Sequence, residues 1–549
     1  MNPPRQPKFL PPTESYAPSP LLIKDLLETG VRAAGDNEIV YRDLLRYDYQ
    51  SLNRRVHQLA HMLTTLGVGA GDTVAVLDWD SHRYLECFFA VPILGAVLHT
   101  VNVRLSAEQV QFTMAHAEGV LVLAHIDFLP LLESIAEQLP LVRGYVLLRD
   151  AAPLPPTPLA VLGEYESLLA QQPEAFDFPS FDENAVATLF YTTGTTGNPK
   201  GVYFTHRQLV LHTLMGINAH AAAGARLLDR DGVYMPITPM FHVHAWGVPY
   251  IATMIGCKQV YPGRYEAERL VSLVVNEKVS YSHGVPTLLG MVLSAAESLQ
   301  ADLKGWKVLV GGSSLAVGLA RRALAMNVDV RGAYGMSETC PIVSISRFTQ
   351  DFPDFDEERE LHWRCSAGVT APLVQMRLVD DHDQPVPQDG HHVGQLMLRS
   401  PWLTSGYFKD PLNSEALWRN GWLNTGDVAS IDSHGLLHIH DRLKDLVKTG
   451  GEWISSLDIE SLLSRHPGVA ECAVIGVPDA QWGERPLALV VLVVGAAPLD
   501  AQQVRSHLMQ FVEQGALSKW AIPGEVRVVA GLPRTSVGKL DKKLIRAQI

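Results

Sequence analysis

A short segment dense in glycine, hydroxyl side chains and one lysine is a candidate phosphate-binding loop. Residues 191–201 read Tyr-Thr-Thr-Gly-Thr-Thr-Gly-Asn-Pro-Lys-Gly. Glycine lets backbone N–H groups approach an anion, threonine hydroxyls add donors, and Lys200 adds a positive charge. The loop is not a Walker A motif, because Gly201 stands where that motif needs Ser or Thr. The apolar run 185–190 predicts a buried strand leading into the loop, which favours a phosphate cradle over a surface turn.

Two further segments carry side chains that could serve a nucleotide. Residues 332–340 place Tyr334 among glycines, where its ring could lie against a base. Glu338 follows four positions later and could bind magnesium through its carboxylate. Asp427 ends the glycine turn of residues 421–427 and could accept ribose hydroxyls, although capping a turn is the commoner role of such an Asp.

Two segments nearer the C-terminus carry charge beside glycine. Residues 441–456 join a charged cluster to a double glycine, and taken alone they read as a solvated linker. Residues 533–540 present Lys539 from a short glycine turn, and taken alone such a lysine is usually a surface charge. Both segments gain meaning only from their order and spacing relative to the others.

The composition predicts a folded protein of more than one domain. Its 549 residues are 47% apolar and 19% charged, and one hydrophobic core does not extend over that length. The net charge of −13 argues against a nucleic-acid or anionic-membrane surface. The longest apolar run, 87–101, is too short for a transmembrane segment. Five dispersed cysteines and an N-terminus without an apolar signal core predict a cytoplasmic protein.

Hydrophobic periodicity divides the chain. Residues 1–20 are rich in proline and are expected to form an extended arm. Alternating strand-like and helical runs, such as 72–78 and 81–89, predict layered α/β architecture in residues 21–440. Within that part, 366–440 alternate apolar and polar residues and predict a small antiparallel β unit. We place a hinge at 441–445 and a compact α+β domain at 446–549, a size typical of an independent domain.

In this order and at these separations, the five motifs resemble those of the adenylate-forming superfamily, which includes acyl-CoA synthetases, luciferases and peptide-synthetase adenylation domains. The resemblance runs from about residue 20 to the C-terminus. Residues 241–247, Phe-His-Val-His-Ala-Trp-Gly, and 450–456 look most like bacterial medium- and long-chain fatty-acyl-CoA synthetases. The implied fold is a large N-terminal domain of two α/β sheets with a β-barrel-like subdomain, covered by a small mobile α+β lid. The hinge begins Asp441-Arg442 where the family often has Gly-Arg, and we expect no catalytic consequence.

The resemblance implies a role for each motif residue toward ATP. The loop would wrap the triphosphate, Thr192 and Glu338 would hold Mg²⁺, and Ser337 would donate to the α-phosphate. Asp427 and Arg442 would take the ribose hydroxyls, and Lys444 would be the pivot of the lid. Lys539 would reach the α-phosphate and the acid. The predicted nucleotide-binding residues are Thr192, Thr193, Gly194, Thr195, Thr196, Gly197, Lys200, Gly312, Ser313, Gly332, Ala333, Tyr334, Gly335, Ser337, Asp427, Arg442, Lys444 and Lys539.

The same resemblance implies sites for the acyl group and for coenzyme A. His242, Val243 and Trp246 would form the acyl pocket and its gate, and His242 joins Lys539, Thr192 and Glu338 as a candidate catalytic residue. The pair His242 and His244 lacks a clear third ligand, which argues against zinc. The predicted coenzyme A path consists of Lys448, Gly450, Gly451, Glu452 and Trp453.

The implied activity is an ATP-dependent acid–thiol ligase. It would convert a medium- or long-chain fatty acid to acyl-AMP, release pyrophosphate, and transfer the acyl group to coenzyme A. ATP, Mg²⁺ and coenzyme A are the expected cofactors. Related fatty-acyl enzymes are often homodimers, to which the arm could contribute a contact, and the sequence does not decide the oligomeric state. An aryl, short-chain or sulfur-containing carboxylate remains an alternative substrate. A catalytically silent nucleotide- or acyl-binding homologue is a further alternative, which the intact motif residues disfavour.

Overall fold

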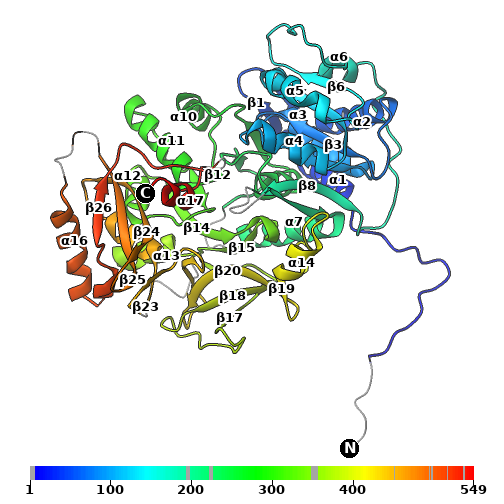
Figure 1. The fold of residues 1–549 in the computed structure, drawn as a ribbon. Helices are drawn as coiled ribbons and strands as arrows, with labels where there is room; N and C mark the ends of the chain where they lie inside the picture. Colours follow the sequence, from blue (N-terminus) through cyan, green and yellow to red (C-terminus); the bar gives the residue numbers. More distant parts are fainter. Residues whose placement is uncertain are drawn as a thin grey trace, which may run out of the picture.

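The computed structural model describes residues 7–192, 198–221, 227–347, 356–450, 452–493, 495, 499–515, 517–535 and 538–549. Two large sheets flanked by helices, one antiparallel sheet and a C-terminal α+β part make up the protein (Figure 1). Residues 7–20 run outward from the body as an extended arm, in which Phe9 is 90% exposed. Within the described residues, no helix has the length and apolar character that crossing a membrane requires.

The first large sheet carries the predicted phosphate loop at one edge. Its strand order is β7-β6-β5-β3-β4-β8-β9, with β9 antiparallel and the other strands parallel. Buried apolar runs explain this arrangement, since parallel strands are covered on both faces. The strands are β3 (Thr73–Leu77), β4 (Val97–Thr100), β5 (Gly119–His125), β6 (Tyr145–Leu148), β7 (Val161–Glu164), β8 (Val186–Thr192) and β9 (Lys200–Thr205). The helices around it are α2 (Tyr49–Thr65), α3 (His82–Ile93), α4 (Ala107–His116), α5 (Leu129–Ile135) and α6 (Tyr165–Leu169).

The second large sheet has nine strands in the order β16-β15-β14-β13-β12-β10-β11-β1-β2. Its centre is parallel, and antiparallel strands close both edges. The strands are β1 (Glu38–Tyr41), β2 (Leu45–Asp48), β10 (Val233–Tyr234), β11 (Lys258–Tyr261), β12 (Tyr281–Gly284), β13 (Lys307–Val310), β14 (Asp329–Gly335), β15 (Ile342–Ile345) and β16 (Val369–Thr370). The remaining helices of this N-terminal part include α1 (Ile23–Ala33), α7 (His206–Ala221), α9 (Val248–Ile255), α10 (Ala267–Asn276), α11 (Pro286–Leu299), α12 (Val317–Ala325), α13 (Glu357–Cys365) and α14 (Pro411–Leu417).

The antiparallel sheet occupies most of the segment predicted to be a β unit. It contains β17 (Gln375–Val379), β18 (Gly394–Arg399), β19 (Trp418–Arg419), β20 (Trp422–Ile431) and β21 (Leu437–Arg442). Strand β16 lies within the same stretch of sequence but pairs with β15 of the nine-stranded sheet. Because β21 runs through Arg442, the charged pair Asp441-Arg442 stands in a strand and not in a solvated linker.

The C-terminal part has a sheet and a core of its own. Its strands are β22 (Val447–Thr449), β23 (Glu452–Ile454), β24 (Val469–Asp479), β25 (Gly483–Leu492) and β26 (Glu525–Val528). Helices α15 (Ser456–Leu463) and α16 (Ala501–Glu513) bury Ile459, Leu463 and Leu508 against this sheet. The short helix α17 (Lys542–Ala547) follows the segment that carries Lys539. A separate core is what a domain able to move as a unit requires.

Candidate active site

A narrow pocket lies where the nine-stranded sheet meets the C-terminal part. Gly311 and Gly312 follow β13, and Tyr334 and Gly335 end β14. Since β13 and β14 are parallel neighbours, their carboxyl ends meet at one edge of the sheet, the usual place for a ligand site. The other lining residues are His242, Val243, Trp246, Ala333, Met336, Ser337, Pro341, Ile342 and Lys539. Residues predicted for adenine, for the acyl gate and for the lid lysine therefore line one pocket.

Tyr334, Asp427 and Arg442 are linked by a hydrogen bond and an ion pair beside this pocket. Tyr334 Oη donates to Asp427 Oδ2 at 2.5 Å, and Arg442 Nε lies 3.2 Å from Asp427 Oδ1. The register of β20 and β21 places Asp427 directly opposite Arg442. Burial and the neighbouring Asp427 carboxylate raise the pKa of Tyr334 well above its ordinary value. The group presents a carboxylate, only 3% exposed, whose partners are hydroxyl and guanidinium donors, the kind of acceptor that ribose hydroxyls require.

Glu338 lies in a short 3-10 turn, η3 (Ser337–Thr339), and is linked to the end of the phosphate loop through Tyr407. Tyr407 Oη donates to Glu338 Oε1 at 2.6 Å. Lys200 Nζ lies 4.7 Å from the centroid of the Tyr407 ring and donates to Asn413 Oδ1 at 2.8 Å. The carboxylate predicted for the metal and the lysine predicted for phosphate thus face the same tyrosine.

Thr192 and Lys200 stand at the two ends of the glycine- and threonine-rich loop. Thr192 is the last residue of β8, and it pairs with Lys200, the first residue of β9. Several predicted residues lie outside the described part of the chain: Thr193, Gly194, Thr195, Thr196 and Gly197 of the loop, and Gly451 of the coenzyme A path.

Lys539 reaches the pocket from the C-terminal part. A Cβ added to Gly312, which has a φ of +79°, would lie 3.2 Å from Lys539 Cε. Burial and the charge of Arg442 lower the pKa of Lys539 to about 8, while Asp427 and Glu338 act in the opposite direction. The buried ammonium is poorly solvated, so an anionic ligand that reaches it would gain from its charge.

The turn that presents Lys539 is fixed by hydrogen bonds. Lys539 N donates to Thr535 Oγ1 at 3.2 Å, and Gly538 N donates to Thr535 O at 2.9 Å. The Gly538 carbonyl accepts from Arg534 Nη1 at 3.1 Å and from Thr287 Oγ1 of α11 at 3.3 Å. The Thr287 contact joins the C-terminal part directly to helix α11 of the N-terminal part.

The predicted acyl gate has an unusual backbone. In Val243, His244, Ala245 and Trp246 the φ angles are 48°, 54°, 45° and 59°, so α8 (Val243–Trp246) is a left-handed turn. Such a conformation costs an L-residue about 1–2 kcal/mol, and it is least tolerated by a β-branched residue such as Val243. Strain of this kind persists only where the surroundings impose it, and it concentrates at functional sites.

His242 precedes this turn, Trp246 is its last residue, and both line the pocket. A Cβ added to Gly311 would lie 3.0 Å from Trp246 Cη2, and the Trp246 ring centroid lies 5.0 Å from that of His283. Burial lowers the pKa of His242 to about 3, and the nearby Lys539 contributes to that shift. His242 is therefore a neutral wall of the pocket at physiological pH.

The described residues of the predicted coenzyme A path, Lys448, Gly450, Glu452 and Trp453, lie on the β22–β23 hairpin, outside the pocket lining. Lys448 Nζ lies 4.3 Å from the centroid of the Trp453 ring, and Trp453 is 50% exposed. Gly450, with a φ of +59°, packs against Trp482, whose Cε3 would be 3.3 Å from an added Cβ. Glu452 is exposed on the same hairpin. The structure thus brings Lys539 to the pocket and leaves the hairpin elsewhere.

The predicted hinge begins with a buried carboxylate. Asp441 Oδ2 accepts from Ser456 N at 2.8 Å, at the start of α15. Burial lowers the pKa of Lys444, three residues further on. Asp441, which replaces the glycine frequent in the family, therefore ties β21 to the first helix of the C-terminal part and does not face the pocket.

The pocket, the fold and the motifs agree with the families that the sequence matches. The AMP-binding enzyme family model matches residues 27–408, and the model of the AMP-binding enzyme C-terminal domain matches residues 458–539. The chain belongs to the AMP-binding enzyme family. The predicted superfamily is thereby confirmed, whereas the predicted domain boundaries and residue roles stay predictions.

Curated relatives of this AMP-binding enzyme align over nearly their whole length. A long-chain-fatty-acid–CoA ligase of Thermus thermophilus is 39% identical over 95% of each chain. A 3-methylmercaptopropionyl-CoA ligase of Ruegeria pomeroyi is 35% identical over 96% of this chain and 97% of that protein. A medium-chain-fatty-acid–CoA ligase of Ectopseudomonas oleovorans is 34% identical over 96% and 95%.

Solved structures confirm the fold class of this AMP-binding enzyme, a larger N-terminal part of α/β sheets with a smaller C-terminal part. The anthranilate CoA ligase AuaEII, in complex with anthranoyl-AMP, superposes with a TM-score of 0.84 at 24% identity, covering 96% of this chain and 98% of that chain. A fatty acyl CoA synthetase of Mycobacterium tuberculosis gives 0.70 at 26% identity, with the same coverage.

Tyr407 is a candidate site residue of this AMP-binding enzyme that sequence reasoning did not find. The available signal was its place beside a glycine, since Tyr407 directly follows Gly406 as Tyr334 directly precedes Gly335. Its partner Glu338 is 69 positions away, so only the fold brings the two together.

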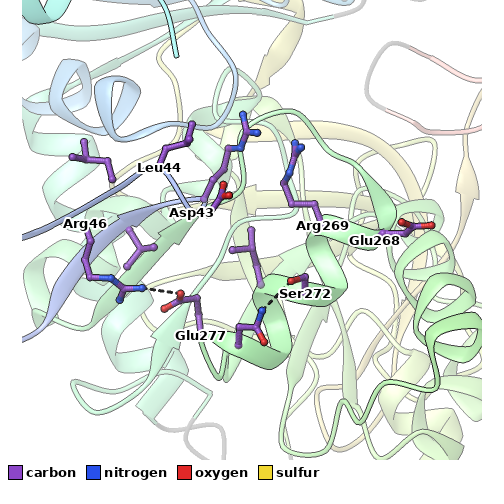
Figure 2. A pocket seen from close by; sticks show the side chains of 12 residues that line it. Asp43, Leu44, Arg46, Glu268, Arg269, Ser272 and Glu277 are labelled. Atoms are coloured by element: carbon purple, nitrogen blue, oxygen red, sulfur yellow. Dashed lines mark hydrogen bonds and ion pairs between the residues drawn. The ribbon is translucent and has the colours of Figure 1, made fainter. Parts of the chain in front are cut away.

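The structure also has a larger groove, but none of the predicted site residues lines it. It lies between the β1–β2 hairpin and α10 and is drawn in Figure 2. Arg46 Nη2 donates to Glu277 Oε1 at 2.8 Å, and Arg269 pairs with Glu266 at 2.9 Å. Because these cations are already paired and none of the motif residues lines the groove, the narrower pocket is the candidate active site of the enzyme.

Proposed function

We propose that this protein is an AMP-forming acyl-CoA ligase that activates a medium- or long-chain fatty acid with ATP. The observation that carries the proposal is the position of Lys539, which lies against Gly312 in a pocket shared with Tyr334 and the His242–Trp246 segment. Relatives named long-chain and medium-chain fatty-acid ligases, at 39% and 34% identity, support this substrate class.

In the first step, the acid carboxylate attacks the α-phosphorus of ATP and pyrophosphate leaves. Both reactants are anions, so the enzyme contributes alignment and charge stabilisation more than covalent chemistry. Lys539 would bind the α-phosphate and the carboxylate, and the Ser337 hydroxyl would donate to the same phosphate. Tyr334 would support the adenine, and Asp427 with Arg442 would hold the ribose.

Glu338 and Thr192 would hold a magnesium ion. The Glu338 carboxylate suits this hard cation, and the Tyr407 hydroxyl orients one of its oxygens. The described residues contain no group of three or more His, Cys, Asp or Glu side chains placed to hold a metal ion, so a resident ion would rely on substrate phosphates for its remaining ligands, as magnesium commonly does. When bound, the ion supplies positive charge beside the phosphates.

In the second step, the thiol of coenzyme A attacks the acyl carbon of acyl-AMP and AMP leaves. The thiol would need space in the pocket that Lys539 lines in this structure. The C-terminal part would turn about Lys444, withdraw Lys539 and bring the hairpin that carries Gly450 toward the pocket. A glycine there would let the narrow pantetheine arm pass close to the backbone. None of the five cysteines lines the pocket, so no acyl-enzyme is needed.

The alternative substrate is an aryl, short-chain or sulfur-containing acid. The relative named 3-methylmercaptopropionyl-CoA ligase is a reason to test a sulfur-containing acid as well. Coenzyme A ligation should be profiled with straight-chain acids from acetate to palmitate, together with anthranilate and 3-methylmercaptopropionate. We expect the highest kcat/KM on medium or long straight-chain acids. A maximum on any of the other acids would overturn the fatty-acid assignment.

The activity itself is tested with Lys539→Ala. We expect acid-dependent ATP–pyrophosphate exchange to fall by about 10²-fold or more, the usual loss when a donor to a developing charge is removed. Thioester formation from supplied acyl-AMP should persist, because Lys539 has left the site in that step. Equal loss of both steps would contradict a lid with two positions, and formation of ADP would contradict the whole proposal.

The remaining expectations concern assembly and location. We propose a homodimer in the cytoplasm. Support comes from the arm, whose Phe9 and Leu10 have no covering partner among the described residues, and from five cysteines that are all free thiols. Light scattering of the purified protein tests the assembly.

A further inference from the structure

The left-handed turn Val243–Trp246 is held at its amino end by two buried hydrogen bonds. Met240 N donates to Asp80 Oδ1 at 2.8 Å. Thr100 Oγ1 donates to Phe241 O at 3.0 Å. Both bonds come from the seven-stranded sheet side of the protein, so the turn is fixed by elements distant from it in sequence.

Asp80 is itself held rigidly. It lies between β3 and α3 and is 4% exposed. Tyr265 Oη donates to Asp80 Oδ2 at 2.5 Å, and the Asp80 backbone carbonyl accepts from Gly263 N at 2.8 Å. One carboxylate oxygen is thus fixed by the loop after β11, and the other is left to hold Met240.

The surroundings of this carboxylate allow it to remain buried. The guanidinium of Arg104 lies 5.9 Å from the ring centroids of both Phe241 and Tyr265. Burial raises the pKa of Asp80 to about 7, and the hydrogen bonds and Arg104 act against that shift. A buried carboxylate is tolerated when its oxygens are hydrogen-bonded, and here one of the bonds goes to the active-site segment.

The carboxyl end of the turn is closed by packing. Gly247 has a φ of +72°, and a Cβ there would lie 2.8 Å from His212 Nδ1. The backbone at Gly247 therefore lies close to His212, which leaves no room for a side chain there, and the amino end of the turn is the end held by hydrogen bonds.

We infer that Asp80 is a positioning residue of the active site, which clamps the amino end of the left-handed turn and thereby sets where His242 and Trp246 stand in the pocket. Asp80 acts through the backbone of Met240 and touches neither pocket residue. The inference rests on the proposed function for its kinetic readout, and it adds a control on acid binding that none of the motif residues provides.

The test compares Asp80→Ala with Asp80→Asn. Asp80→Ala removes the acceptor for Met240 N–H, and it should raise the KM for the acid in ATP–pyrophosphate exchange by about tenfold or more, because small misplacements of binding groups are costly. The KM for ATP should change little. Asp80→Asn keeps an acceptor oxygen and should stay close to the wild type. Tyr265→Phe is the matched control, since it removes a buried hydrogen bond to the same carboxylate but leaves Met240 held.

A second variant separates positioning from general damage. Glycine adopts positive φ without a steric penalty, so Ala245→Gly should make the turn easier to hold. Placed in the Asp80→Ala background, it should restore most of the lost acid affinity. A general loss of packing would not be repaired by removing another methyl group.

Amide hydrogen exchange gives a readout that is independent of catalysis. Peptides covering residues 240–247 should exchange faster in Asp80→Ala than in the wild type, Asp80→Asn or Tyr265→Phe. If Asp80→Ala does not fold, Thr100→Val tests the same clamp through Phe241 and should raise both the acid KM and the exchange rate. If the wild type exchanges no pyrophosphate with any acid, the proposed function fails, and hydrogen exchange still decides the clamp.

Three results would overturn the inference. The first is an unchanged acid KM and unchanged exchange in the folded variant that removes the clamp. The second is damage by Asp80→Asn equal to that of Asp80→Ala, which would mean that charge matters and not the acceptor. The third is a parallel rise of both KM values that Ala245→Gly does not relieve.

Discussion

The burial and charged neighbours of the Lys539 ammonium are the features of a single residue that bear most directly on the proposed reaction. Burial and Arg442 disfavour its charge, while Asp427 and Glu338 favour it, and its pKa falls to about 8. A lysine that is charged near neutral pH but poorly solvated binds an anion strongly, because the anion replaces the missing water. Among the described residues that line the pocket, Lys539 is the only lysine or arginine, which supports its proposed role as the partner of the α-phosphate.

The pKa of Lys539 predicts a pH dependence for the first half-reaction. The side chain carries its proton below about pH 8 and loses it above, so kcat/KM for adenylation, which reports the free enzyme, should fall as pH rises through about 8. Lys539→Arg should lack this decline, because a guanidinium stays protonated throughout that range. Pyrophosphate exchange from pH 6 to 10 measures it. The same decline in thioester formation from acyl-AMP would assign it to another group.

The second prediction at the scale of a single residue concerns the hydrogen bond between Tyr407 and Glu338. Tyr407→Phe removes the 2.6 Å hydrogen bond to Glu338, and a bond to a charged group is worth about 1.5–3 kcal/mol. Adenylation should slow by about tenfold or more, and more Mg²⁺ should be needed for half-maximal rate. Tyr203→Phe on β9, outside the pocket lining, is the control. An unchanged Mg²⁺ requirement would contradict the role assigned to Glu338.

Among the elements, the loop after β13 decides how closely the lid lysine approaches the sheet. Gly312 has a φ of +79°, and an added Cβ would lie 3.2 Å from both Lys539 Cε and Val285 Cγ1. The end of β14 supplies the opposite wall, where Gly335 leaves room for the Pro341 carbonyl only because it has no side chain. Glycines at the ends of β13 and β14 thus let the two walls of the pocket come close enough for a ligand to contact both.

Gly312→Ala should lower adenylation by about tenfold or more, since the new methyl group displaces Lys539 and the backbone conformation costs a further ~1 kcal/mol. Gly305→Ala is the matched control, because Gly305 has a φ of +89° and nothing within 4 Å of an added Cβ. Gly305→Ala therefore has the same unfavourable backbone conformation as Gly312→Ala, but its new methyl group contacts no other residue. Kinetics and thermal unfolding of both variants measure the difference, and equal activity losses would remove the steric explanation.

For the whole molecule, function depends on how the C-terminal part sits on the N-terminal part. Besides Lys539, a close approach joins α12 to the end of α15: a Cβ on Gly318 would lie 2.6 Å from the Ser464 carbonyl oxygen. That contact occurs in the same arrangement that places Lys539 in the pocket, and Gly318 does not line the pocket. A change at Gly318 therefore acts on the arrangement and not on the pocket.

Gly318→Ala should disfavour this arrangement, slow adenylation several-fold, and leave thioester formation from acyl-AMP intact or faster. Gly290→Ala, on the neighbouring helix α11, meets only Leu319 Cδ1 at 3.9 Å and should change neither step. Separate assays of the two half-reactions measure both variants. A slower thioester step in Gly318→Ala would show that the contact serves both positions of the lid.

Local hydrophobic patterns in the sequence predicted many helices and strands correctly, but they did not predict the exact residue at which several of them end. The strand expected over 72–78 is β3 (Thr73–Leu77), since a continuous apolar run is buried whichever partner it meets. The helix expected over 81–89 continues to Ile93 with Pro92 inside it, because α3 is packed on every side and tertiary burial outweighs the loss of one hydrogen bond. The left-handed turn at Val243–Trp246 has no local sequence signal, since none of its four residues is a glycine.

By itself, the sequence determined the family, the class of chemistry and the motif residues, because close backbone approach to phosphate requires glycine and charge stabilisation requires lysine and carboxylates at set places in the chain. Only the tertiary structure decided that Tyr407 faces Glu338, that Asp80 holds Met240, and that Lys539 lies at Gly312 while the hairpin of Trp453 lies outside the pocket. These contacts join residues far apart in the chain through packing, and packing depends on the shapes of all the neighbours at once.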